Sequence, residues 1–221
     1  MSHTNEAEAG QAIYSKLVLS IYDWWVLAVS NKYIWQCPTE RMVALYNAHI
    51  TANHLDIGVG TGYYLDHCRF PTDQPRLVLI DLNENSLETT ARRVARYRPE
   101  TRRQNVLEPF KPEPARFDSV GLNYLLHCLP GDIAAKAVVF DHAKSVLNQG
   151  GVLFGATLLQ TGVERSGMAK RLMKVYNRKQ IFSNRADSLA ALQESLAGRF
   201  AKFELEVIGC AALFWGQVDG R

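Results

Sequence analysis

The residues of this chain that are best placed for chemistry are two acids and three alternate glycines. Asp56 closes a short apolar run, and Gly58, Gly60 and Gly62 follow at every second position. A second apolar run ends in Asp81, nineteen residues after Gly62. Glycines allow a tight turn and a backbone that approaches a ligand closely, because no Cβ stands in the way. An acid after the next strand can accept from ribose hydroxyls, so the pattern predicts a nucleoside site at the carboxyl ends of parallel strands.

The spacing also limits which nucleotide can bind. A dinucleotide-binding turn carries Gly or Ala three residues after its second glycine, and Tyr63 stands at that place. A phosphate-binding P-loop needs Gly-Lys-Ser/Thr, whereas two tyrosines follow Gly62. An aromatic side chain fills space that a diphosphate requires. The sequence therefore favours a ligand that has a nucleoside and no phosphate.

The elements that would position these residues follow from the hydrophobic pattern. Apolar runs without strict alternation predict strands covered on both faces, as in a parallel sheet. The expected strands are 54–57, 77–81, 103–106, 119–122, 152–158, 203–209 and 211–218. The expected helices are 62–69, 84–98, 132–147, 163–176 and 188–199. Since only a turn near Gly209 separates the last two strands, they should pair antiparallel at the edge of the sheet.

Two stretches lie outside this alternation of strands and helices. Residues 1–10 are typical of a loose tail, and 11–50 predict a helical cap because apolar residues recur there at helical spacing. We expect a single domain over 11–221, with an α/β core in 51–221 and an insertion on the substrate side in 160–187. In α/β enzymes, such peripheral elements near the strand carboxyl ends determine substrate specificity.

The composition narrows the class of protein. The 221 residues are 47% hydrophobic and 21% charged, which is typical of a soluble globular protein. A formal net charge of +3 is too small to imply a polyanionic partner by itself. The four cysteines lie far apart, which favours reduced thiols in the cytoplasm. The polar N-terminus does not resemble a signal peptide, and the apolar run 17–29 is short for a membrane span. We therefore expect a cytoplasmic protein without a membrane partner.

Four segments, in this order, resemble the motifs of the class I S-adenosylmethionine-dependent methyltransferases. They are 56–62 with its glycines, Asp81 as the ribose acid, 117–130 around the fourth strand, and 147–154, which opens the fifth strand. The resemblance implies an α/β fold, Rossmann-like and doubly wound, with a seven-stranded mostly parallel sheet. It also implies a C-terminal antiparallel hairpin, an N-terminal helical cap, and S-adenosyl-L-methionine as the cofactor.

The resemblance assigns roles around that cofactor. Asp56 would neighbour the methionine amino group, the glycines would line the homocysteine and ribose, and Asp81 would accept from the ribose hydroxyls. Leu82 would offer an apolar surface to the adenine. Asn105 and Val106 stand where many members carry an acid that contacts the adenine amino group, and an amide can still accept from that amine.

The backbone at Asn123 would face the methionyl end of the cofactor. Some methyltransferases hold Mg²⁺ with carboxylates at this strand end. Neither Asn123 nor the three residues after it supply a carboxylate, and a hard divalent cation needs charged oxygen ligands. We expect no metal.

His127 is the first candidate for a catalytic base, and Tyr22 is the second. An imidazole near the transferring methyl could take a proton from a hydroxyl or amine nucleophile. The alternative is that His127 only packs or hydrogen-bonds in the wall of the cleft. Four other histidines, among them His54, have no partners at ligand spacing and are interpreted as surface or capping groups.

Aromatic residues crowd the first predicted helix. Trp25, Trp35 and Tyr22 are among them, and Tyr63 follows the glycines. One hypothesis is that they cover the cofactor sulfonium and line a pocket for a flat or apolar substrate, and the other is that they pack onto the domain. We expect substrate contacts from Trp25, Trp35 and Tyr63.

These observations predict methyl transfer to an O, N or C nucleophile of a small, aromatic or natural-product-like molecule. Holding both reactants in a closed, dry cleft would supply much of the catalysis. Two alternatives stay open: a methyltransferase of RNA or protein, and a protein of the same fold that binds the cofactor without transferring methyl. The arginines between 92 and 103 could follow a nucleic acid, but they also fit a solvated helix face, so we expect no nucleic-acid partner. A homodimer is left open.

Overall fold

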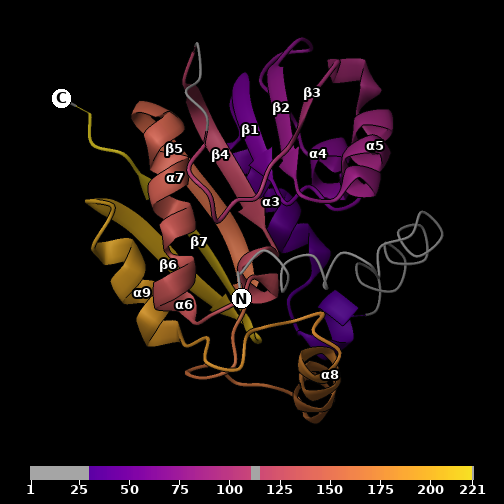
Figure 1. Cartoon of the computed structure of the whole chain (residues 1–221), viewed down its shortest axis with the longest axis vertical. Helices are drawn as coiled ribbons and strands as arrows, with labels where there is room; N and C mark the ends of the chain where they lie inside the picture. The colour runs from indigo at the N-terminus through magenta and orange to yellow at the C-terminus, as the bar shows by residue number, and fades with distance from the viewer. Residues whose placement is uncertain (1–29, 111–114, 221) are drawn as a thin grey trace.

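The computed structural model describes residues 30–110 and 115–220. Seven strands in this part of the chain form one sheet in the order β3-β2-β1-β4-β5-β7-β6 (Figure 1). They are β1 (Asn53–Ile57), β2 (Arg76–Asp81), β3 (Glu100–Arg103), β4 (Phe117–Asn123), β5 (Leu147–Leu158), β6 (Lys202–Ile208) and β7 (Ala211–Gln217). The first five run parallel, and β7 runs antiparallel to both β5 and β6. The predicted fold is confirmed.

The strand order reverses between β1 and β4. From β1 the chain passes to β2 and β3 on one side, and it returns to β4 and β5 on the other. The loops that leave β1 and β4 therefore diverge, and in open α/β sheets ligands bind in the crevice at this switch point. Asp56 pairs with Gly121 across the junction. The glycine loop after β1 and Asn123 at the end of β4 flank this switch point.

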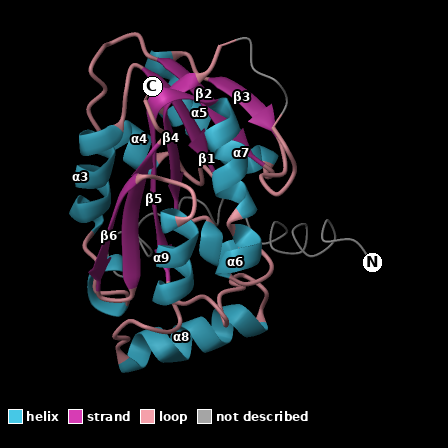
Figure 2. Ribbon diagram, turned by 90° about the vertical axis from the view of Figure 1, so that its left-hand side faces the viewer, coloured by secondary structure: helices cyan, strands magenta, loops and turns pink. Residues whose placement is uncertain are grey.

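Helices cover both faces of the sheet (Figure 2). One layer consists of α3 (Thr39–His49), α4 (Tyr63–His67) and α5 (Glu84–Arg93), and the other of α6 (Ile133–Lys136), α7 (Val138–Val146) and α9 (Leu189–Ala197). Alternate residues of β2 reach the two layers, since Leu77 and Leu79 join one apolar cluster and Val78 and Ile80 join the other. Burial on both faces explains why the strands lack an alternating pattern.

A third apolar cluster lies near the carboxyl end of β5 and is built largely by the stretches outside the alternation. Residues 30–37 contribute Ile34 and Trp35, and α8 (Gly167–Arg178) contributes Met173, with Phe182 after it. Figures 1 and 2 show α8 beyond the end of the sheet, apart from both helix layers. The Ser166 hydroxyl donates to the Ile34 carbonyl at 3.0 Å and so joins the two stretches.

Several element bounds differ from the expectation. The strand expected at 103–106 is β3 at Glu100–Arg103, because an edge strand exposes most of its side chains and needs no apolar run. The helix expected over 84–98 ends at Arg93 and gives way to the 3₁₀ helix η2 (Ala95–Tyr97). The helix expected over 132–147 is divided into α6 and α7. The helix expected from Val163 begins only at Gly167, after the cap residue Ser166.

The predicted tail and most of the first predicted helix lie outside the described residues. What is described of the predicted cap is a π-helical turn over residues 30–34 and the helix α3. No helix in the described part of the chain is long and apolar enough to cross a membrane.

Candidate active site

The glycine loop joins β1 to α4. Gly58, Gly60 and Gly62 have φ angles of +72°, +54° and +73°, the left-handed region that favours glycine. A Cβ on Gly58 would lie 2.8 Å from the Leu125 side chain, and one on Gly62 would lie 2.7 Å from Thr90. A Cβ on Gly60 would meet nothing within 4 Å. Gly60 therefore faces space that a ligand can fill, whereas its two neighbours are packed against protein.

Thr90 of α5 is a site residue that the sequence analysis missed. It is fully buried, and its hydroxyl donates to the carbonyl of Gly60 at 3.2 Å. It therefore holds the middle of the loop in place. The sequence gives only a weak signal for this role, because the partner of Thr90 is a backbone carbonyl. Thr90 lies three residues after buried Leu87 and therefore on the same inward face of α5.

Asp81 ends β2 with its carboxylate against the same loop. It accepts from the backbone N–H of Asn83 at 2.8 Å, and also from the backbone N–H groups of Val59, Gly60 and Leu82. Burial nevertheless raises the pKa of Asp81 to about 6, because it disfavours the anion more than these donors favour it. The carboxylate is thus poised to gain from further hydrogen-bond donors such as hydroxyls.

Asp56 lies in a buried hydrogen-bond network beneath the loop. Its Oδ2 accepts from the Tyr46 hydroxyl at 2.8 Å and lies 3.3 Å from Nε2 of His54. Nδ1 of His54 lies 2.8 Å from the Ser119 hydroxyl, so the network ties α3 to β1 and β4. The contact of Asp56 with the methionine amino group stays a prediction.

His54 is fully buried in that network. The interpretation of His54 as a surface or capping group is therefore wrong. Residues two apart on a strand point to the same face, so His54 necessarily falls beside Asp56. The missed signal was the acid at this spacing on a strand buried on both faces.

The residues expected at the adenine end lie together. Arg103 pairs with Asp81 between β3 and β2, so Asn105 and Val106 lie just beyond the Asp81 end of the sheet. Oδ1 of Asn105 accepts a backbone N–H two residues on at 3.1 Å, and its second lone pair can accept from an amine. Val106 is buried, and Leu82 beside Asp81 is partly exposed.

Asn123 ends β4 with an amide that has no hydrogen-bond partner within residues 30–110 and 115–220. Its side chain is buried, and neither Nδ2 nor Oδ1 is satisfied there. An unsatisfied buried polar group costs about 1–3 kcal/mol, so native proteins rarely keep one without a ligand or another purpose. An amide both donates and accepts, and it could therefore hold the ammonium or the carboxylate of an amino acid.

His127 lies in the 3₁₀ helix η3 (Leu126–Cys128) and is buried. The Leu158 N–H donates to its Nδ1 at 3.3 Å, which assigns the proton of the neutral ring to Nε2. Burial, and then the charge of nearby Lys136, lower the pKa of His127 to about 3. The neutral ring has no free lone pair for a substrate proton, and this geometry suits a wall residue better than a base.

His127 belongs to an aromatic cluster that we define as Trp35, Tyr124, His127, Tyr176 and Phe182. The Phe182 ring centroid lies 4.5 Å from His127, 5.0 Å from Tyr176 and 6.1 Å from Trp35, and Tyr124 lies 5.5 Å from His127. Trp35 is buried within it, while Tyr124 and Tyr176 are partly exposed. Because Tyr124 follows Asn123, the cluster forms an apolar wall beside the unpartnered amide.

The other expected substrate contacts are not part of this cluster. Tyr63 stacks on the ring of exposed His67 at a centroid distance of 3.9 Å. Tyr22 and Trp25 lie outside the described residues. No three acidic, histidine or cysteine side chains gather in the described part of the chain where they could hold a metal ion.

The geometry fits an adenosyl thioether. Open space beside Gly60 admits a ligand close to the backbone, Asp81 offers an acceptor for hydroxyls, and the amide of Asn123 awaits a polar partner. The three lie at the carboxyl-terminal edge of the sheet, from the end of β2 to the end of β4.

Comparison with known proteins decides the family. Residues 55–153 match a family described as a methyltransferase domain. The chain is 43% identical over 205 residues to the demethylluteothin O-methyltransferase of Streptomyces thioluteus, covering 93% of this chain and 89% of that one. It is 41% identical over 222 residues to the physcion biosynthesis cluster O-methyltransferase of Aspergillus chevalieri, covering 97% of each. The chain belongs to the class I S-adenosylmethionine-dependent methyltransferases. The methyltransferase therefore uses S-adenosylmethionine, as the motifs indicated.

Solved structures agree with this methyltransferase on the fold. A structure described as a DhpI–SAH complex matches with a TM-score of 0.71 at 17% identity, covering 100% of this chain and 99% of that one. A structure of the CurJ carbon methyltransferase matches with a TM-score of 0.70 at 13% identity, covering 96% of this chain and 61% of that one. The whole described architecture is thus that of known methyltransferases.

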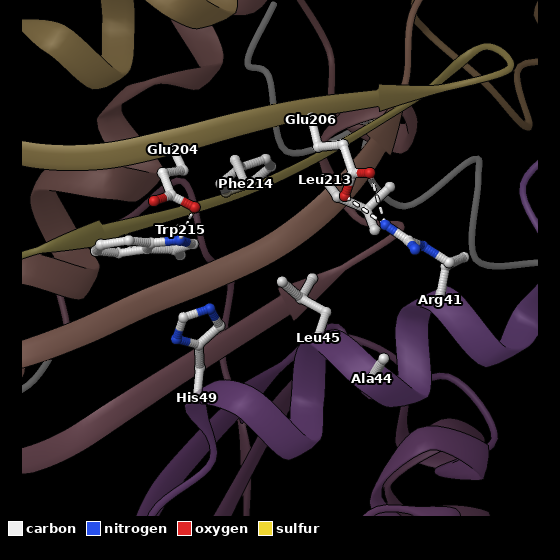
Figure 3. Close-up of a pocket in the computed structure, with 9 residues that line it drawn as sticks. All are labelled: Arg41, Ala44, Leu45, His49, Glu204, Glu206, Leu213, Phe214 and Trp215. Carbon is white, nitrogen blue, oxygen red and sulfur yellow. Dashed lines mark hydrogen bonds and ion pairs between the residues drawn. The ribbon is translucent and has the colours of Figure 1, made fainter.

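A separate groove of about 250 Å³ lies between α3 and the β6–β7 hairpin of the methyltransferase (Figure 3). Its acids are already engaged: Glu206 accepts twice from Arg41, at 2.6 and 2.7 Å, and Glu204 accepts from the indole N–H of Trp215 at 3.2 Å. The groove shares no residue with the glycine loop, Asp81 or the aromatic cluster. It lies apart from the active site.

Proposed function

We propose that this methyltransferase transfers a methyl group to a hydroxyl oxygen of a small, planar and largely apolar molecule. The observation that carries the proposal is the aromatic cluster, whose members Tyr124 and Tyr176 are partly exposed and in which Tyr124 directly follows the end of β4. Flat aromatic walls suit a flat acceptor and exclude water. Two relatives that match nearly the whole chain are named O-methyltransferases, which supports oxygen as the nucleophile.

The described residues divide the binding of the cofactor between them. When bound, S-adenosylmethionine supplies a methyl group activated on a sulfonium. Asp81 accepts from the ribose hydroxyls, and the bare backbone of Gly60 permits close approach. The amide of Asn123 forms its hydrogen bonds with the methionyl end of the cofactor.

The adenine end of the cofactor belongs to the residues beyond Asp81 in this proposal. Leu82 and Val106 offer apolar surface, and Asn105 accepts from the exocyclic amine. Their grouping at the end of β2 and β3 supports this division.

Catalysis in this proposal comes mainly from positioning. Holding two reactants at attack distance can contribute about 7–11 kcal/mol. His127 shapes the wall as a neutral ring, because its Nδ1 is occupied and its pKa is about 3. An acidic hydroxyl, such as a phenol or an enol, then loses its proton to bulk water before the site closes, and no protein base is required. Tyr22, the second candidate for a base, keeps that role as a prediction.

The proposed domain organisation separates the cofactor side from the acceptor side. We assign the acceptor side to the 11–50 cap and the 160–187 insertion, since the third apolar cluster combines Trp35 with Met173 and Phe182. Trp25 and Tyr63 remain proposed substrate contacts. The four cysteines are free thiols, which supports a reducing compartment such as the cytoplasm.

The test is a competition among nucleophiles of one shape. The purified enzyme is incubated with methyl-labelled S-adenosylmethionine and three matched planar aromatics that carry a hydroxyl, an amine or an activated carbon, and products are identified by mass spectrometry. We expect the methyl ether as the main product. Preferential labelling of the amine or carbon analogue would refute O-methylation, and labelling of added RNA or protein instead of all three would refute a small acceptor.

A further inference from the structure

The outer face of α8 carries an unbalanced positive charge. All seven charged residues from Arg165 to Arg185 are basic, although the chain has a net charge of only +3. Six of them are exposed: Lys170, Arg171, Lys174, Arg178, Lys179 and Arg185. None of these six forms an ion pair with another described residue. Exposed Arg41, by contrast, is paired with Glu206 at 2.6 Å.

The charges are arranged along the helix rather than scattered. Lys170, Lys174 and Arg178 follow at intervals of four residues, so they span about 12 Å on neighbouring turns. The side of α8 around Ala169 and Met173 is buried against the third apolar cluster, so this stripe points to solvent. The helix contains no acid that could neutralise it.

Two exposed apolar side chains belong to the two segments that meet at the start of α8. Tyr33 is 62% exposed and Met168 is 60% exposed, more than any other large apolar side chain of the described residues. The bond from the Ser166 hydroxyl to the Ile34 carbonyl holds their two segments together. Tyr, Met and Arg are enriched in protein–protein interfaces, which combine an apolar centre with a polar rim.

We propose that this surface, formed by the stripe with Tyr33 and Met168, docks an acidic protein whose carboxylates face the cations of α8. Complementary charge of this kind steers encounter and sets the register of a complex. The cations are confined to one helix and the loop after it, which fits the footprint of a protein helix better than the longer track of a nucleic acid. Since α8 packs on the aromatic cluster, the partner lies beside the acceptor site, a consequence that rests on the proposed function.

The test measures binding by the full-length enzyme, independently of methyl transfer. The probe is a fluorescent helical peptide with Glu at intervals of four residues, and the matched control peptide carries Gln at those positions. The variant K170E/K174E/R178E reverses the stripe, and R69E/R98E/K202E reverses three exposed cations of other elements with the same change in net charge. Fluorescence anisotropy at low salt reports both affinities.

We expect the Glu peptide to bind and the Gln peptide not to bind. The stripe variant should weaken binding at least about tenfold, the control variant less than about threefold, and salt should weaken it further. Both variants should bind S-adenosylhomocysteine with wild-type affinity in calorimetry, which shows that they fold. Equal weakening by both variants would overturn the proposal. So would tighter binding to single-stranded RNA or to vesicles of anionic lipid than to the Glu peptide.

Discussion

At the scale of single residues, burial in the free enzyme disfavours the ionised form of Asp81. A folded-state pKa of about 6, above the ordinary value of 3.8, means that Asp81 lowers the stability of the free fold as the pH rises from about 4 to 6. In the proposed site, hydroxyl donors from the ribose would favour the anion. Cofactor affinity should therefore be constant above pH 7 and fall as the pH drops through about 6, which calorimetry with S-adenosylhomocysteine between pH 5 and 8 can measure.

The variant Asp81→Asn should separate binding from stability. An amide oxygen can still accept from the Asn83 N–H, but no buried anion remains. We expect affinity for S-adenosylhomocysteine to fall by about 1–3 kcal/mol, while the free protein no longer loses stability as the pH rises from about 4 to 6. Calorimetry and thermal unfolding check the two effects. Unchanged affinity would remove Asp81 from the ribose site.

His127 offers a second prediction at this scale. Asn in its place can still accept the Leu158 N–H, so His127→Asn should keep the turnover number within about threefold of wild type. His127→Ala leaves that buried N–H without a partner and should cost about 1–3 kcal/mol in the free energy of unfolding. Steady-state kinetics and urea unfolding provide the readout. A hundredfold loss of turnover in a folded His127→Asn variant with normal cofactor affinity would instead establish a base.

At the scale of elements, the structure of the glycine loop leads us to expect different effects of alanine at Gly60 and at Gly62. Both Gly60→Ala and Gly62→Ala place a side chain at positive φ, a strain of about 1–2 kcal/mol. The new methyl of Gly60→Ala enters space left for the ligand, whereas that of Gly62→Ala meets Thr90 inside the protein.

We therefore expect Gly60→Ala to lose cofactor affinity at least tenfold with a modest loss of stability, and Gly62→Ala to lose mainly stability. Thermal unfolding and calorimetry of both variants give the comparison. If both lost affinity equally, the ligand would not approach the backbone at Gly60.

The elements also show where sequence reasoning succeeds and fails. Motifs with fixed spacing placed Asp81 and the glycines correctly at strand ends, since their geometry is local. The shift of β3 and the burial of His54 were missed, because an edge strand needs no apolar pattern and the His54 partner Ser119 comes from another strand. The role of Thr90 depends on packing between α5 and the loop, which no local pattern encodes.

At the scale of the whole molecule, a buried ion pair fastens the insertion to the core. Lys136 of α6 donates to both oxygens of Asp187 at 2.7 and 2.8 Å and to the Ser183 carbonyl at 2.8 Å, and both side chains are fully buried. Lys136→Met leaves Asp187 as a buried carboxylate without its cation, so the free energy of unfolding should fall by about 3–5 kcal/mol.

The double variant Lys136→Met with Asp187→Leu tests that reason, because it removes both charges. We expect it to recover most of the loss in urea unfolding. A double variant as unstable as Lys136→Met alone would show that the pair stabilises the fold by more than mutual neutralisation.

The turn between β6 and β7 packs against the segment that carries Trp35. A Cβ on Gly209 would lie 2.1 Å from the Trp35 carbonyl, and Cys210, 175 residues further along the chain, donates to it from its N–H at 3.1 Å. The hairpin that holds Trp35 therefore follows the glycine loop, Asp81 and Asn123 in the chain and is synthesised after them. Since β7 also lies buried between β5 and β6, we expect the sheet and the surroundings of Trp35 to be completed together, so that acceptor specificity is acquired only when this hairpin closes.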